Sequence, residues 1–286
     1  MSLDFVTLLL YNICIEFSGQ VFMKCFDINY NFHTHTYFCS HAVGEIEDYI
    51  KRAISCGVKK MGFSDHIPLK FPDGKESFYR VPTDKVCEYF RITRELREKY
   101  KGEIDIKIGF ESEYYPQYFS EMLRSAIEYG AEYLILGQHF YEPENIGYRR
   151  TIDKTDDEAS LTQYCDLVTE AIETRVFSYV AHPDIVNFCG DEKIFFREVR
   201  KIAEASLKHN IPLEINLLGI REGRNYPNPL FWQIVGEVGS PVTFGFDSHD
   251  IQAAYDGESL PFAFRLVREC SLNYIGEPRL LPISDI

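Results

Sequence analysis

The stretch INYNFHTHTYFCSH, residues 28–41, decides the fold because it joins a short apolar run to a group of histidines. Ile28 to Phe32 predicts a β-strand, and His33, His35 and His41 follow at its end. Side chains two residues apart in an extended chain point to the same face, so His33 and His35 can share one metal ion. The same pattern, an apolar strand followed by potential metal ligands, recurs along the chain.

Strand-like and helix-like segments alternate through most of the sequence. The predicted strands are residues 28–32, 60–63, 105–110, 133–136, 176–180, 212–216 and 242–246. The predicted helices between them are residues 45–56, 83–100, 119–129, 161–174, 195–209 and 229–238. This alternation is typical of parallel βαβ units. Seven strands of this kind predict an α/β fold with a (β/α)7 barrel, and an eight-stranded barrel is the near alternative.

Potential metal ligands gather at the ends of these predicted strands. Histidine is the commonest side-chain metal ligand, and carboxylates usually complete the site for a divalent ion. In a parallel barrel the C-terminal strand ends meet at one mouth, where we expect the ligands to converge. The candidates are His33, His35, His41, His66, Glu111, His139, His182, Asp247 and His249. Nine ligands are too many for one ion and predict a multinuclear site.

Two choices within this set rest on position alone. Glu111 is preferred to Glu113 because strand alternation places it nearer the barrel mouth, and Glu113 stays open as an alternative. His209 falls outside the pattern, near the end of a predicted helix. We expect it to interact with that helix terminus rather than with metal.

Composition narrows the class of protein. The 286 residues include 44 acidic and 30 basic ones, for a net charge of −14, which disfavours a nucleic-acid-binding surface. Bound cations can nevertheless hold a phosphate group inside an acidic protein. The eight cysteines form no CxxC pair, as expected for reduced thiols in a cytoplasmic protein. Residues 1–25 are interpreted as an N-terminal extension, and their apolar run is too short to span a membrane.

The ordered set of motifs, HxH, a further His, DH, Glu, His, His and DxH, resembles the polymerase and histidinol phosphatase (PHP) family. The stretches GFSDHIPL, GFESEYYP, LILGQHF, YVAHPDIV and LEINLLGIREG are similar to its histidinol-phosphatase branch. This resemblance implies a distorted (β/α)7 barrel over residues 26–286, with its active site at the C-terminal strand ends. It also implies three divalent ions, which would be zinc, iron or manganese.

The resemblance assigns ligands to each ion. His33, His35, Glu111 and Asp247 would hold the first. Glu111, as a bridge, would hold the second with His139 and His182. The third would be held by His41, His66 and His249.

The activity implied is metal-dependent hydrolysis of a phosphomonoester, namely histidinol phosphate plus water to histidinol and inorganic phosphate, in histidine biosynthesis. A hydroxide bridging two ions would attack phosphorus. A phosphoesterase acting on another small phosphorylated metabolite or nucleotide is the alternative. A nuclease or polymerase-associated module is disfavoured by the acidic charge. We expect neither a nucleic-acid nor a membrane partner.

Roles beyond metal binding are assigned from position. Asp247 is the preferred proton shuttle, with His249 and Asp65 as the other candidates near the third ion. Asp65 is expected to orient a ligand histidine. Arg221, Arg224 and Glu113 lie in segments that follow predicted strands, and they are expected to contact the substrate.

Overall fold

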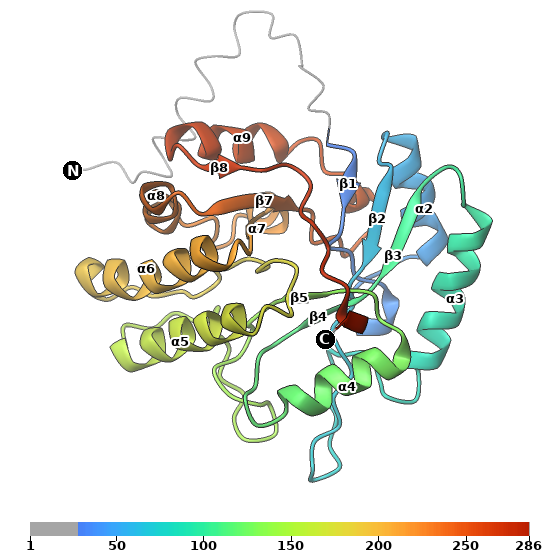
Figure 1. Cartoon of the computed structure of the whole chain (residues 1–286), viewed down its shortest axis with the longest axis horizontal. Helices are drawn as coiled ribbons and strands as arrows, with labels where there is room; N and C mark the ends of the chain where they lie inside the picture. The colour runs from blue at the N-terminus through green and yellow to red at the C-terminus, as the bar shows by residue number, and fades with distance from the viewer. Residues whose placement is uncertain (1–27, 286) are drawn as a thin grey trace, which may run out of the picture.

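The computed structural model describes residues 28–285, in which short strands lie at the centre and helices surround them (Figure 1). The predicted extension at residues 1–25 lies outside these residues. In chain order the elements are β1 (Tyr30–Asn31), η1 (Tyr37–Cys39), α2 (Ile46–Ser55), β2 (Lys60–Phe63), α3 (Val86–Lys99), β3 (Asp105–Ile108), β4 (Phe110–Ser112), α4 (Phe119–Tyr129), β5 (Leu134–Leu136), α5 (Glu158–Thr174), α6 (Glu192–His209), β6 (Leu213–Asn216), α7 (Leu217–Glu222), α8 (Pro229–Val238), β7 (Pro241–Gly245), η2 (Gln252–Ala254), α9 (Leu260–Glu269), β8 (Asn273–Tyr274) and η3 (Ile283–Asp285).

The strands form three sheets in which every pair is parallel. The sheets have the orders β1-β2-β3, β4-β5 and β6-β7-β8. Single parallel bridges continue the pairing between them: Thr34 with Ser248, His66 with Glu111, Leu136 with Val180, and Val180 with Leu213. The parallel α/β fold predicted from the alternation is therefore confirmed. Because the strands run the same way, their C-terminal ends lie on one side of the molecule.

Two predicted strands differ from the structure in more than the positions of their ends. Residues 176–180 form no regular strand, although Ser178 N–H donates to Leu134 O and Val180 N–H donates to Pro212 O. The segment therefore lies between β5 and β6, but only Val180 forms bridges. The predicted strand 105–110 divides at Gly109, where the chain changes its partner from β2 to β5. A Cβ atom at Gly109 would lie 2.4 Å from Tyr133 O, so this crossing point has no room for a side chain.

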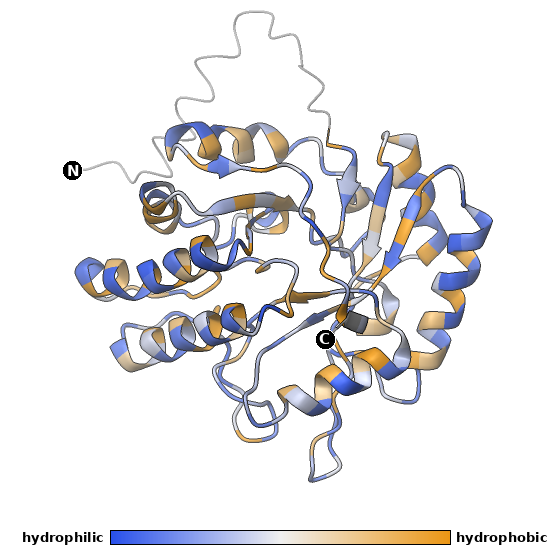
Figure 2. Cartoon of the chain, in the orientation of Figure 1, coloured by the Kyte–Doolittle hydropathy of each residue, from blue (hydrophilic) through white to orange (hydrophobic). Residues whose placement is uncertain are grey.

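Polar caps and amphipathic faces explain where the helices lie. Asp157, Asp191 and Asn228 precede α5, α6 and α8, and each side chain accepts hydrogen bonds from backbone N–H groups of the first turn. Figure 2 shows hydrophobic and hydrophilic bands along the helices. In α2 the buried residues keep the spacing of one helical face: Ile46, Tyr49, Ile50 and Ala53. Within residues 28–285, no helix combines the length and apolarity needed to cross a membrane.

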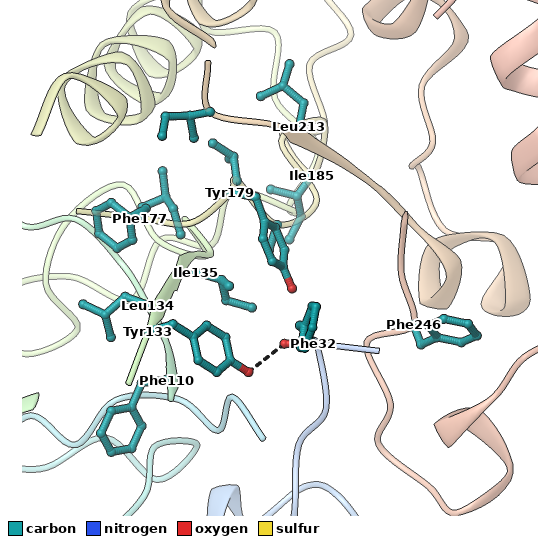
Figure 3. Packing of buried hydrophobic residues seen from close by; sticks show 14 of the residues in the cluster. Phe32, Phe110, Tyr133, Leu134, Ile135, Phe177, Tyr179, Ile185, Leu213 and Phe246 are labelled. Atoms are coloured by element: carbon teal, nitrogen blue, oxygen red, sulfur yellow. Dashed lines mark hydrogen bonds between the residues drawn. The ribbon is translucent and has the colours of Figure 1, made fainter. Parts of the chain in front are cut away.

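Tyr133 connects the ends of β1 and β2 to the start of β5 inside the core, and Figure 3 shows its contact with Phe32. Its side chain is fully buried, and its hydroxyl donates to Phe32 O at 2.9 Å and Phe63 O at 3.3 Å. Gly62 leaves room for this hydroxyl, since a Cβ there would lie 2.1 Å from it. The hydrogen bonds fix the ends of β1 and β2, from which the first two groups of histidines continue.

Replacing Tyr133 with phenylalanine should lower the free energy of unfolding by about 1–2 kcal/mol, because two buried hydrogen bonds are lost without a change of shape. Urea denaturation followed by circular dichroism measures this difference. Tyr37→Phe, at a side chain on the surface, is the matched control and should change stability little. Equal stabilities for the wild type and Tyr133→Phe would contradict the role assigned to the hydroxyl.

Candidate metal centre

The structure brings all nine predicted ligands into one cluster beyond the C-terminal strand ends. Neighbouring imidazole rings lie in contact, with centroids 4.3–5.8 Å apart for pairs such as His35–His249 and His33–His182. Two buried carboxylates, Glu111 and Asp247, lie among the rings. Glu111 comes from β4, and Asp247 follows β7, so segments far apart in the sequence meet here.

Glu111 faces two different groups of imidazoles with its two oxygens. Its Oε1 lies 2.9 Å from Nε2 of His182 and 3.5 Å from Nε2 of His139. Its Oε2 faces a second group, at 3.2–3.5 Å from His33 Nε2, His35 Nε2 and His66 Nδ1. A carboxylate placed between two sets of nitrogen donors is arranged as a bridging ligand would be.

Asp247 makes the second carboxylate contact with the histidines. Its Oδ1 lies 3.4 Å from Nε2 of both His33 and His35, and 3.3 Å from Nδ1 of His249. Its Oδ2 accepts a hydrogen bond from Asn216 Nδ2 at 3.0 Å, which fixes the rotation of the carboxylate. His33 and His35 therefore have Glu111 Oε2 on one side and Asp247 Oδ1 on the other.

The donor atoms fit divalent metal ions. In a tetrahedral site with bonds near 2.0–2.1 Å, neighbouring donors are about 3.3–3.4 Å apart, close to the separations found here. Glu111 Oε2 and Asp247 Oδ1 are buried and have no hydrogen-bond partner. Unpartnered buried oxygens are costly, and a cation would satisfy them. The mixture of imidazole and carboxylate donors suits zinc, iron and manganese alike.

The charges of the cluster are strongly coupled. Burial raises the pKa of the Glu111 carboxyl, but the imidazoles of His139 and His33 together hold that pKa well below its usual range. Burial also raises the pKa of the Asp247 carboxyl, but the nearby imidazoles, chiefly that of His33, hold this pKa well below its usual range. Burial lowers the pKa of His33, yet the carboxylates of Asp247 and Glu214 leave it raised well above the ordinary value. Protons and metal ions therefore compete for the same nitrogens.

Glu214 supports the cluster from behind, and the sequence analysis missed it. It is fully buried within β6, and its Oε1 lies 2.8 Å from Nδ1 of His33. Its Oε2 accepts hydrogen bonds from the backbone N–H of His182 and from Asn216 Nδ2. The signal was present in LEIN, where a carboxylate falls inside a buried strand and must have a partner.

The predicted orienting residue Asp65 has a different contact. Its oxygens accept hydrogen bonds from the backbone N–H and the hydroxyl of Thr36, both at 2.8 Å, rather than from an imidazole. Burial raises the pKa of Asp65 to about 6. Asp65 therefore fixes the turn after His35, and its prediction as a partner of a histidine ring is not supported by this position. The buried Cys39 lies close by, with Sγ 3.9 Å from Nε2 of His41.

Two ligand positions have backbone conformations that are rare for residues with side chains. His182 has φ of 30° and Asp247 has φ of 47°. Such conformations cost about 1–3 kcal/mol each and persist only where surrounding contacts impose them. Here Glu214 holds the N–H of His182, and Arg221 Nη2 donates to the carbonyl of Asp247.

A cavity of about 440 Å³ opens onto the cluster. Its inner wall is formed by ligand candidates, including Glu111 and Asp247. Its outer wall is largely aromatic and apolar, with three charged side chains, and of its residues only Arg224 was predicted: Phe78, Tyr79, Phe140, Tyr148, Arg150, Ile152, Ile185, Leu218, Glu222, Arg224 and Tyr226. No local sequence pattern identifies it, because its members come from separate loops.

The three predicted substrate contacts have different positions. Arg224 lines the cavity, where it pairs with Glu222. Arg221 does not line it; its guanidinium pairs with Asp256 and holds Asp247 O. Glu113 is fully buried outside the lining and contacts protein groups. Arg221 and Glu113 therefore contact other protein groups behind the cavity and do not lie on its wall. His209 lies apart from the cluster, at the end of α6 beside Arg175.

A parallel α/β fold with imidazole and carboxylate donors gathered at the strand ends defines a metal-dependent hydrolase. The PHP domain model matches residues 31–217, so the chain belongs to the PHP family.

Curated relatives cover most of the chain. A "Probable histidinol-phosphatase" of Deinococcus radiodurans is 22% identical, over 76% of this chain and 85% of the relative. One of the same name from Thermotoga maritima is 26% identical, over 85% and 93%.

Solved structures share the fold. The histidinol phosphate phosphatase of Lactococcus lactis, in complex with zinc, L-histidinol and phosphate, has a TM-score of 0.66. It is 20% identical and covers 86% of this chain and 95% of that one. The protein hisK of Listeria monocytogenes has a TM-score of 0.67 at 22% identity, covering 81% and 99%.

Replacing Gly137 with alanine should weaken metal binding, because the new Cβ would lie 1.9 Å from Glu111 Oε1 and displace the carboxylate. The measurement is the divalent-metal content per chain after dialysis, determined by mass spectrometry. Gly257→Ala is the matched control, since its nearest neighbour is a Tyr255 ring carbon at 3.3 Å, and should retain the wild-type content. Full metal retention by Gly137→Ala would show that the carboxylate position is unimportant.

Proposed function

We propose that this protein is a metal-dependent phosphatase that converts histidinol phosphate and water to histidinol and inorganic phosphate. The observation that carries the proposal is the Glu111 carboxylate, whose two oxygens face separate sets of imidazoles at the base of a cavity. The names of the curated relatives and the ligands of the Lactococcus lactis structure support the choice of substrate. The cavity volume of about 440 Å³ is appropriate for a small phosphomonoester.

Three divalent ions, each zinc, iron or manganese, complete the proposed site. His33, His35, Glu111 and Asp247 would hold the first, and Glu111 would share the second with His139 and His182. The third would be held by His41, His66 and His249. When bound, such ions neutralise the charge of phosphate oxygens and lower the pKa of bound water, so that hydroxide is present at neutral pH.

The protein's own groups would position the substrate and move a proton. Asp247 and His249 both line the cavity, and His249 Nδ1 lies 3.3 Å from Asp247 Oδ1. We assign the protonation of the leaving alkoxide to this pair, with Asp247 as the shuttle. Arg224, on the outer wall, is the proposed contact for the substrate. The aromatic wall would exclude water from the substrate's organic part.

We also propose that the strands form a seven-stranded barrel. The pairing Thr34–Ser248 beyond β7 and β1 supports this closure, as do the bridges from Val180 to Leu136 and Leu213. These bridges would place residues 176–180 as the strand between β5 and β6.

The purified protein, loaded with manganese, zinc or iron, should release phosphate from histidinol phosphate and lose this activity on chelation. Phosphate release by a colorimetric assay measures it, with AMP and single-stranded DNA as comparison substrates. Faster hydrolysis of AMP would indicate another small phosphomonoester as the substrate. Cleavage of DNA without release from either monoester would overturn the proposal.

Replacing His139 with alanine should reduce kcat/KM by about 100-fold or more, because the second ion loses one of its proposed ligands. Steady-state kinetics at saturating metal measure the change. His209→Ala is the matched control, since this histidine lies outside the cluster. A His139→Ala variant with full activity would rule out the proposed arrangement of ions.

A further inference from the structure

A fully buried arginine lies behind the metal centre, in the loop between β2 and α3. Arg80 is 1% exposed and does not line the cavity. Its guanidinium pairs with the carboxylates of Glu113 and Glu144 and donates to the carbonyl of Ile67. A buried arginine is costly unless its donors are satisfied, and the planar fork of the guanidinium allows it to hold two carboxylates at once.

The first carboxylate connects Arg80 to a proposed metal ligand. Glu113 Oε2 pairs with Arg80, while its Oε1 accepts the Tyr79 hydroxyl at 2.6 Å and lies 2.8 Å from Nδ1 of His139. A carboxylate at this position keeps the proton on Nδ1, so that Nε2 of His139 has its lone pair free for an ion. That Nε2 faces Glu111 Oε1 at 3.5 Å.

The second carboxylate connects Arg80 to another loop of the cavity wall. Glu144 lies between β5 and α5 and also accepts the Tyr115 hydroxyl at 2.9 Å. The same loop carries Phe140, whose ring lies 5.4 Å from that of Tyr79. Arg80 therefore joins two of the loops that supply the aromatic wall, and the Glu113 ion pair continues to the metal centre.

We infer that Arg80 is a positioning residue that acts through Glu113 to orient His139, and so sets the affinity of the His139 end of the centre for its divalent ion. The inference rests on the proposed metal site. Tyr79, on the cavity wall, donates a hydrogen bond to the same Glu113 carboxylate. The position of the β2–α3 loop therefore also affects how His139 is oriented. The Glu144 ion pair holds the loops together without contacting the histidines.

Metal affinity in the absence of substrate tests this directly. Purified metal-free protein is titrated with Co²⁺, whose visible absorption reports coordination, in competition with a chromophoric chelator. Arg80→Met and Glu113→Gln should each weaken the binding of one ion by about 10–100-fold, the usual effect of removing a hydrogen-bonded partner of a ligand histidine. Tyr79→Phe should weaken the binding of the same ion by a smaller factor, because it removes one hydrogen bond to Glu113 and leaves the Arg80–Glu113 ion pair in place.

The two arms of Arg80 provide the matched control. Glu144→Gln removes the other ion pair and should leave Co²⁺ affinity within about twofold of the wild type. The double variant Arg80→Met/Glu113→Gln should bind Co²⁺ no more weakly than Glu113→Gln alone, because both changes act on one path. Equal affinities for the wild type and Glu113→Gln, or equal losses in Glu144→Gln and Glu113→Gln, would overturn the inference.

Two further results keep the test decisive. If Arg80→Met does not fold, Glu113→Gln and Tyr79→Phe still test the path, and wild-type affinity in both would refute it. If the wild type binds no Co²⁺, the proposed metal-dependent function fails as well. Binding by the wild type with no change in the variants refutes only the positioning role.

Discussion

One buried carboxylate, Glu111, determines how the rest of the site is built. Its oxygens face five imidazoles that come from four separate segments of the chain, and one of those oxygens has no hydrogen-bond partner. Negative charge of this kind is stable in a protein interior only when positive charge compensates it. The histidines can supply that charge as protons, and divalent ions can replace the protons. The parallel strands matter because they bring these segments to one place.

A second set of polar groups holds the cluster in shape. Glu214 supports His33 and the backbone of His182, Glu113 supports His139, and Asn216 supports Asp247. Each supporting group is itself buried and fixed by further contacts, which limits the freedom of the imidazoles. Glycines next to the carboxylates leave the space that these side chains occupy: a Cβ at Gly245 would lie 1.5 Å from Glu214 Oε1.

Local patterns in the sequence predicted most of the helices and strands. Helices 119–129 and 229–238 and strand 60–63 have the predicted bounds, because their apolar spacing and the flanking glycines are local signals. The segment 176–180 was less predictable, since two neighbouring strands decide whether it pairs regularly. Arg80 and Glu214 were missed for a related reason: their partners lie 33 and 181 residues away, and local periodicity carries no information about such pairs.

The left-handed backbone at Asp247 also restricts which acid can occupy that position. Asparagine and aspartate adopt this conformation more readily than other residues with side chains, because their short polar groups bond to the nearby backbone. Glu111, by contrast, lies on an extended strand, where a longer side chain is needed to reach between two sets of rings. The two acids are therefore not interchangeable, although they carry the same charge. In this fold the backbone conformation at each position therefore determines whether the shorter or the longer acidic side chain fits there, independently of any bound ion.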